Sequence, residues 1–330
     1  MCLGVLLRMR RLAAQAAAGR HDIDRDLEEW DNPGLTHQSG SGGAAMSHSA
    51  QTAVGTVVSL WRYPVKSMMG EELNAAEVTE LGLLGDRAYA LVDGSDGKVA
   101  SAKNPKKWPR LFDFRAAFAG DPRVGAEMPP VRITMPDGTV ITSEHGELNA
   151  ALSRVLNREV TFKGARRERG ESSVSAWTPQ AEEYWPDMDG LDYRDTVTDF
   201  ELPEGTFFDC AVVHLLTTST LDRLRELYPQ GRFEVRRFRP NVIAQTVENV
   251  KEFVEDAWID RTVAIGEDVQ LRITGPCPRC VMTTLPQADL PKDPGILRAA
   301  AQNNHANVGV YASIVRGGTI HRGDAIALMD

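Results

Sequence analysis

Residues 131–142 read VRITMPDGTVIT, two short apolar runs on either side of the dipeptide Asp137-Gly138. Asp-Gly between runs rich in β-branched residues is the strongest short-range signal for a β-hairpin. Upstream, similar strand-like runs occupy residues 54–61, 87–92 and 112–118. Downstream, an apolar stripe of period 3.6 predicts a helix over 146–157, and REVTFKG (158–164) resumes strand character. The first half of the chain is therefore expected to be rich in β-structure.

A second ordered block begins at FFDCAVVHLLTT (207–218). Ser219 or Thr220 is suited to cap a helix over 220–229. Further strands are expected at 232–236, 241–245, 262–265, 268–274, 307–315 and 324–328, with one helical stretch at 294–303. The sequence thus predicts a mainly β fold, α+β by content, with a few short helices.

The composition divides the chain into four segments. Residues 1–53 end in a Gly- and Ser-rich stretch and predict a disordered leader, within which Met46 is an alternative start to Met1. Its Arg-rich beginning also raises the alternative of a targeting peptide. Residues 54–163 form the first domain, 164–205 a charged connecting segment or lid without sustained periodicity, and 206–330 the second domain.

Charge and cysteine content narrow the class of protein. A formal net charge of -9 argues against general binding to nucleic acid or to anionic membranes. The chain has no apolar run near the roughly 18 residues that a membrane span requires. Four cysteines are too few for a disulfide framework, and their number favours a reducing, cytoplasmic location.

The strongest local signal for chemistry is ITGPCPRCVMTTLP (273–286). Gly275-Pro276 is expected to end a strand and to leave Cys277 and Cys280 in the following loop. A thiol binds metal only as thiolate, and the adjacent Arg279 favours that state. The pattern leaves four alternatives open: a zinc half-site completed by Cys210 and His214, a thioredoxin-like redox pair, a single thiolate ligand for a soft metal, and an inert structural pair.

Two further clusters could bind an anion. In VRRFRPNV (235–242), a strand would place Arg237, Arg239 and Asn241 on one face, which suits a phosphate; a solvated basic strand edge is the alternative. In the first domain, Lys66 and Ser67 follow Pro64 in WRYPVKSMMG (61–70), and Arg87 opens the strand after Gly85-Asp86. Each cluster alone is weak evidence for an anion-binding site.

Jointly, YPVKS, GLLGDR, FRPN, an acidic residue before Trp in FVEDAW, and GPCPRC leading into TT occur in an order that resembles the MOSC family with its amino-terminal β-barrel domain. The resemblance extends over about residues 54–328 and includes bacterial MOSC proteins similar to the mitochondrial amidoxime reducing component. It implies a two-part β-barrel architecture that holds a pterin-based molybdenum cofactor.

The resemblance also implies roles for individual residues. Cys280 would be the molybdenum ligand and catalytic centre, while Cys277 is not carried over as a ligand. The cofactor-binding residues would be Lys66, Ser67, Arg87, Arg239 and Asn241, with Thr217, Ser219 and Arg279 as further members. No general acid is identified, although Glu252, Glu255, Asp256, His305 and His321 lie in segments that could reach the site.

The implied reaction removes oxygen from an N-hydroxylated small molecule, such as an amidoxime or hydroxylamine. No Cys-x4-Cys-x2-Cys run for an iron–sulfur cluster is present, so a ferredoxin-like, cytochrome or flavin donor must supply electrons. Pyridoxal phosphate is not expected, because the chain has no room for the domain that would bind it. The alternatives are a carrier of the cofactor or of sulfur without turnover, and a zinc-stabilised binding module.

Overall fold

A barrel of seven strands closes on itself within the described part of the chain, in the order β13-β12-β16-β15-β14-β18-β1 and back to β13. Its strands are β1 (Gln51–Arg62), β12 (Val213–Thr217), β13 (Val242–Thr246), β14 (Thr262–Ile265), β15 (Val269–Pro278), β16 (Asn307–Arg316) and β18 (Ala325–Met329). The pair β12–β13 is parallel, because helix α3 (Thr218–Leu227) makes the crossover between them. The expected mainly β fold is confirmed.

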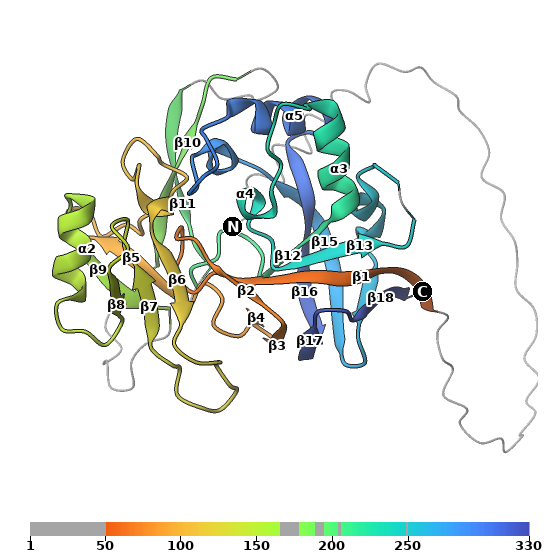
Figure 1. Cartoon of the computed structure of the whole chain (residues 1–330), viewed down its shortest axis with the longest axis horizontal. Helices are drawn as coiled ribbons and strands as arrows, with labels where there is room; N and C mark the ends of the chain where they lie inside the picture. Colours follow the sequence, from red (N-terminus) through yellow and green to blue (C-terminus); the bar gives the residue numbers. More distant parts are fainter. Residues whose placement is uncertain (1–50, 166–177, 189–194, 204–205, 249, 330) are drawn as a thin grey trace, which may run out of the picture. The chain divides into compact units, whose positions relative to one another are not determined.

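The computed structural model describes residues 51–165, 178–188, 195–203, 206–248 and 250–329 (Figure 1). All of them belong to one unit, Ala50–Asp330. The predicted leader therefore lies outside the described residues, apart from the start of β1.

Strand β1 belongs to the amino-terminal half of the sequence but completes the carboxy-terminal barrel. It pairs antiparallel with β13, for example Gly55 with Thr246, and with β18, where Gln51 faces Met329 (Figure 1). Its Val57 side chain is buried in the core of the barrel. The two parts of the fold are therefore interlocked.

In its described residues, the first part consists of short strands, the 3-10 helix η1 (Leu111–Asp113) and one α-helix. It contains β2 (Glu71–Leu73), β3 (Ala75–Thr79), β4 (Gly82–Leu83), β5 (Tyr89–Asp93), β6 (Arg115–Phe118), β7 (Val131–Thr134), β8 (Val140–Thr142), α2 (Leu148–Leu156) and β9 (Val160–Gly164). The hairpin predicted at Asp137-Gly138 is confirmed: β7 pairs with β8, and Gly138 has φ of 85°. The predicted helix over 146–157 is confirmed as α2. Late in the chain, β17 (Gly318–His321) returns to pair with β3.

Helices α3 and α5 (Pro294–Asn304) share a third core, in which Leu221 and Leu224 pack with Ile296 (Figure 1). The expected helix at 294–303 is thus confirmed. The predicted cap of α3 is wrong: Thr217, in extended conformation, caps it with a hydroxyl that accepts from the Thr220 amide at 3.1 Å.

Three other local expectations are corrected. Residues 232–236 are not a strand, because Val235–Phe238 form the short helix α4. The strand β15 does not end at Gly275 but continues irregularly to Pro278. The connecting segment 164–205 contains an antiparallel hairpin, β10 (Gln180–Trp185) with β11 (Thr196–Glu201).

Among the helices of the described residues, none has the length and apolar character to cross a membrane.

Candidate functional site

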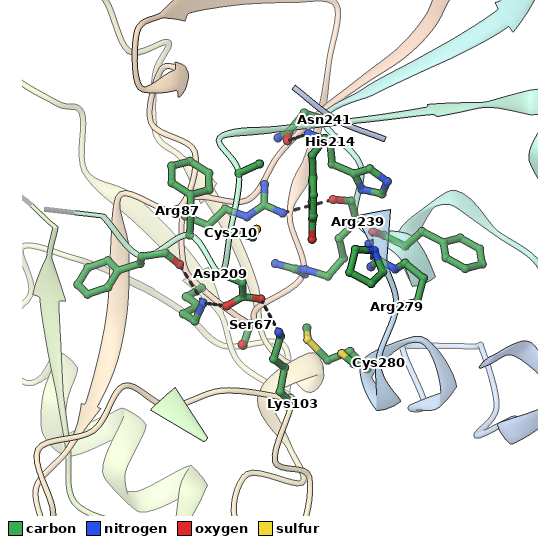
Figure 2. A pocket seen from close by; sticks show the side chains of 18 residues that line it. Ser67, Arg87, Lys103, Asp209, Cys210, His214, Arg239, Asn241, Arg279 and Cys280 are labelled. Atoms are coloured by element: carbon green, nitrogen blue, oxygen red, sulfur yellow. Dashed lines mark hydrogen bonds and ion pairs between the residues drawn. The ribbon is translucent and has the colours of Figure 1, made fainter. Parts of the chain in front are cut away.

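A cavity lies between the first part of the fold and the barrel, and both contribute to its wall (Figure 2). Its polar lining includes Lys66, Ser67, Arg87, Lys103, Asp209, His214, Arg239, Asn241, Arg279 and Cys280. Five of the lining side chains are Lys or Arg, against one carboxylate. In a chain with net charge -9, this concentration of positive charge favours an anionic ligand.

Lys66 and Ser67 lie in the turn that follows β1. Ser67 has φ of 63°, and its hydroxyl accepts a hydrogen bond from the Ala102 amide at 3.0 Å. The Lys66 ammonium donates to the Phe207 carbonyl at 2.9 Å and to the Asp209 carboxylate. The turn therefore presents both side chains, nearly buried, at the wall of the cavity.

Asp209 joins two lysines of the first part to the second part. Its carboxylate contacts Lys66 and lies 3.5 Å from the Lys103 ammonium. Burial would raise the pKa of Asp209, but the two lysines hold that pKa well below its usual range. Burial lowers the pKa of Lys66, and Asp209 opposes this change. The carboxylate thus keeps part of the cationic cluster charged.

The Tyr63 ring contacts two guanidinium groups. The Arg87 Cζ atom lies 4.5 Å and the Arg239 Cζ atom 4.1 Å from the centroid of its ring. Arg239 also donates to the Met68 carbonyl at 2.6 Å, and Arg87 to the Arg239 carbonyl at 3.3 Å. Burial, with Arg87 nearby, lowers the pKa of Arg239 to about 10. Contact with the Tyr63 ring stabilises both guanidinium groups, so two like charges can lie close together in the wall of the cavity.

Asp86 and Asn241 connect the parts behind this wall. The buried Asp86 carboxylate accepts from the Tyr63 amide at 2.7 Å, from Arg87, and from the Asn241 side-chain amide at 2.9 Å. Asn241 also donates to the Trp61 carbonyl at 3.3 Å and accepts from the His214 amide at 3.1 Å. Both amide donors of Asn241 are thus used inside the protein, so Asn241 shapes the wall.

Arg237 does not belong to the cavity, which corrects the expectation that it shares a face with Arg239. Because α4 replaces the expected strand and Arg239 then adopts φ of 54°, the two side chains diverge. Arg237 is fully buried and donates to the carbonyl oxygens of Arg232, Thr283, Leu285 and Pro291. Its role is to hold these segments together.

The two cysteines of GPCPRC occupy different environments. Cys277 lies in β15, is fully buried, and accepts from the Arg279 Nη1 atom at 2.7 Å. Cys280 follows the strand, is partly exposed, and lines the cavity (Figure 2). Both are free thiols. Arg279 contacts Cys277, and its charge lowers the pKa of the Cys280 thiol, as expected; burial outweighs this effect and raises that pKa to about 12.

Thr217 and Ser219 were expected among the cofactor-binding residues, but they do not line the cavity. The Thr217 hydroxyl donates to the buried Glu255 carboxylate at 2.6 Å. The Ser219 hydroxyl contacts the carbonyl oxygens of Val250 and Glu252 at 2.6 and 2.9 Å. Both hydroxyls therefore serve the start of α3 and the short helix η2 (Val254–Trp258).

The residues considered as possible general acids, including Glu255 and His321, do not line the cavity either. His214 does line the cavity, where its Nε2 atom lies 3.0 Å from the Val308 carbonyl. Burial, with the charge of Arg279, lowers the pKa of His214 to about 3, so its ring is neutral. Within the described residues, no group of three His, Cys, Asp or Glu side chains could hold a metal ion, which speaks against the zinc alternative.

Two family models match the chain: "MOSC N-terminal beta barrel domain" over residues 54–179 and "MOSC domain" over residues 203–327. Together they account for most of the chain. The chain belongs to the MOSC family. Mitochondrial amidoxime reducing component 2 of Macaca fascicularis is 25% identical over 241 residues, covering 70% of this chain and 67% of that protein. Mitochondrial amidoxime-reducing component 1 of Homo sapiens is 26% identical over 249 residues, covering 70% and 66%.

Among solved structures, the YUAD protein from Bacillus subtilis matches 85% of this MOSC chain and 97% of its own, with 9% identity and a TM-score of 0.41. The predicted membership of the MOSC family is thus confirmed by the two domains and by the named relatives. These relatives also indicate an oxidoreductase at the level of the family.

Sequence reasoning missed three polar lining residues of this MOSC protein: Lys103, Asp209 and Tyr311. Lys103 stands in a polar loop after β5, and Asp209 in an irregular stretch before β12. No motif distinguished them, because their importance comes from the contact between the two parts of the fold. Tyr311 could have been suspected from its strand β16, where it is the half-buried position beside buried Val310 and Ala312.

The cavity of the MOSC protein combines a thiol with a cluster of cations. The thiol offers one soft ligand, and the guanidinium and ammonium groups can bind phosphate or other anions. The Arg279 Nε atom is buried without a partner among the described residues, so it has a donor to offer. This set fits an anionic, metal-containing ligand.

Proposed function

We propose that this protein binds a molybdenum cofactor through Cys280 and reduces N-hydroxylated small molecules such as amidoximes. The observation that carries the proposal is the position of Cys280: a free, partly exposed thiol in a cavity whose lining has five cationic side chains. The names of the relatives support the reaction class. We place the activity in the cytoplasm, where thiols stay reduced.

The donor set suits this cofactor better than a hard metal ion. Mg²⁺ and Ca²⁺ require several oxygen ligands, whereas the cavity offers one soft sulfur and a single carboxylate that Lys66 and Lys103 already engage. Burial disfavours the Cys280 thiolate, since it raises the pKa of the free thiol to about 12. A coordinating metal ion reverses this preference, because it deprotonates a thiol ligand outright.

The remaining residues would bind and orient the organic part of the cofactor. Lys66, Ser67, Arg87 and Arg239 are the proposed contacts for phosphate and pterin, and Arg279 adds its unpartnered Nε donor. Asn241 acts behind them, by holding Asp86 and the His214 backbone in place. The cofactor, when bound, supplies a two-electron redox centre.

The overall reaction balances as a reduction of the N–O bond. An amidoxime takes up two electrons and two protons, the N–O bond breaks, and the products are an amidine and water. The electrons come from an external ferredoxin-like protein or a cytochrome or flavin reductase. The protein residues hold the substrate, exclude bulk water and keep the positive charge of the cavity in place.

Metal content and turnover test the proposal together. Protein from cells supplied with molybdate should contain about one molybdenum per chain and, with a chemical reductant, convert benzamidoxime to benzamidine. Cys280→Ser should lose both properties. Cys277→Ser is the matched control, since its thiol faces Arg279 in the strand, and it should keep much of each.

The other outcomes separate the alternatives. Full molybdenum loading without turnover would favour a carrier of the cofactor. Zinc without molybdenum would favour a zinc-stabilised module. Loss of activity in Cys277→Ser alone would overturn the assignment of Cys280.

A further inference from the structure

The hairpin β10–β11 of the connecting segment fixes one lysine at the cavity. The Tyr184 amide donates to the Lys103 carbonyl at 2.8 Å. Glu183 of β10 lies 3.3 Å from the Lys103 ammonium, and the Phe200 ring of β11 has its centroid 4.7 Å from the same atom. Both strands of the hairpin therefore hold Lys103, through its backbone, its charge and a ring face.

Lys103 keeps donors available for a ligand. Its ammonium lies 3.3 Å from Glu183 and 3.5 Å from Asp209, whereas charge-assisted hydrogen bonds between nitrogen and oxygen are about 2.7–2.9 Å long. An ammonium has three donors, so these two longer ion pairs do not exhaust it. Burial lowers the pKa of Lys103, but the charges of Asp209 and Glu183 raise it well above its ordinary value, so Lys103 stays charged.

Lys103 also faces the reacting end of the cavity. Both it and Cys280 line the same cavity. Figure 2 shows the Lys103 ammonium pointing toward Asp209, with Cys280 beside it in this view. A substrate atom that meets a metal bound at Cys280 would therefore lie close to a fixed positive charge.

We infer that Lys103 is a substrate-contacting residue that distinguishes the N-hydroxylated substrate from its deoxygenated product. This inference rests on the proposed function. An amidoxime is neutral near pH 7 and carries an oxygen that can accept a hydrogen bond from the ammonium. Loss of that oxygen leaves a strongly basic amidine, which is protonated and cationic.

The product therefore loses an attractive contact with Lys103 and gains a repulsive one. The two carboxylates near Lys103 are already paired, Asp209 with Lys66 and Lys103 and Glu183 with Lys103, so neither is free to compensate the new cation. The class of substrate that this site favours is thus a neutral N-hydroxylated compound whose product is a cation. Lys103 binds the neutral substrate and promotes release of the cationic product.

Equilibrium binding to the molybdenum-loaded, oxidised protein tests the inference without turnover, because no reductant is present. We expect the wild type to bind benzamidoxime more tightly than benzamidine. Lys103→Met should reduce this preference at least about tenfold, the effect of one charge-assisted hydrogen bond, while molybdenum content stays near one per chain. Lys103→Arg should retain most of the preference.

Lys106→Met is the matched control. Lys106 stands three residues further on, contacts Asp195 at 2.8 Å and the Tyr184 ring at 4.2 Å, and is exposed outside the cavity. It should bind both compounds as the wild type does. Glu183→Gln, which weakens the hold on Lys103 without removing it, should give an intermediate preference and provides a second measurement if Lys103→Met does not fold.

The inference is overturned if the wild type lacks the preference, if Lys103→Met and Glu183→Gln retain it in full, or if Lys103→Met loses molybdenum, because Lys103 would then hold the cofactor. The proposed function fails separately, when loaded wild-type protein with reductant forms no benzamidine. If the loaded protein shows no turnover but its binding preference still depends on Lys103, the contact with Lys103 stands and the proposed reaction is wrong.

Discussion

At the scale of single residues, three cavity side chains stand on backbone that L-residues rarely adopt. Ser67, Arg87 and Arg239 have φ of 63°, 48° and 54°. Such conformations cost about 1–3 kcal/mol each and persist where the surrounding structure demands them. All three side chains line the cavity, so backbone strain and site geometry occur together here.

Ser67 allows this strain to be measured. Ser67→Ala and Ser67→Gly both remove the hydroxyl that accepts from the Ala102 amide, but only glycine relieves the positive φ. We expect the glycine variant to be more stable than the alanine variant by about 1 kcal/mol in urea unfolding. A glycine variant no more stable than the alanine variant would contradict this expectation.

Arg237 and Arg239 should separate stability from ligand binding. Arg237→Met leaves four backbone carbonyls without their donor, so we expect the free energy of unfolding to fall by at least about 3 kcal/mol. Arg239→Met should mainly reduce molybdenum content, since its guanidinium lines the cavity. Urea titration and metal analysis of both variants check this division, and the reverse pattern would contradict it.

These two arginines also show what the sequence could reveal about the site. The FRPN motif correctly indicated that a basic residue and an amide lie together. Cys280, Lys66, Ser67 and Arg87 were chosen from separate motifs, and all four line the same cavity. The spacing argument placed Arg237 and Arg239 together on a strand geometry that the chain does not adopt, and only the resemblance to the MOSC family selected Arg239. A period of two assigns both to one face, whereas a helical turn followed by a positive φ separates them.

At the scale of elements, strands were predicted well where β-branched residues alternate, as in β7 and β14, and missed where the buried position is charged. In β10 the buried residues are Ala181 and Glu183. A carboxylate in an inward position hides the alternation, and only its pairing with Lys103 in the folded protein makes it acceptable. The sequence alone could not show that partner, because it stands about 80 residues away.

The short helix η2 offers a prediction about pH. Glu255 is fully buried and accepts from the hydroxyls of Thr217 and Thr220 at 2.6 and 2.7 Å. Burial raises its pKa above the ordinary 4.5, and the hydrogen bonds only partly oppose this. A carboxyl whose folded pKa is raised stabilises the fold most below its unfolded pKa, and this contribution is lost as pH rises through the folded pKa.

Glu255→Gln imitates the protonated carboxyl and removes this titration. We therefore expect the free energy of unfolding of the wild type, relative to Glu255→Gln, to decrease as the pH rises from below 4.5. Urea unfolding of both proteins at several pH values measures this difference in the free energy of unfolding. A difference that grows in the opposite direction would contradict the raised pKa.

At the scale of the whole molecule, the boundary between the two matched domains does not coincide with the boundary of the seven-stranded barrel. The amino-terminal family model begins at residue 54, yet β1 lies between β13 and β18 of the carboxy-terminal barrel. Without β1, both of those strands would present open edges, which favour aggregation. The two parts should therefore depend on each other for folding.

A fragment of residues 206–329 tests this dependence. It lacks β1, including the buried Val57 and Leu60, so we expect it to aggregate or to unfold without cooperativity. The same fragment with residues 51–62 appended behind Met329 should fold, because Gln51 faces Met329 across the β1–β18 pair and a short Gly-rich turn can join them. Circular dichroism during urea unfolding distinguishes the two.

Gly55 supplies the control for this experiment, because a Cβ atom there would lie 2.5 Å from the Gln245 carbonyl oxygen. The appended strand with Gly55→Val should therefore fail to close the barrel and behave like the bare fragment. If the bare fragment instead unfolds as cooperatively as the extended one, the barrel does not need β1. The cavity between the two parts would then form by docking of independent domains, and its geometry would depend on contacts such as that between Asp86 and Asn241 more than on a shared strand.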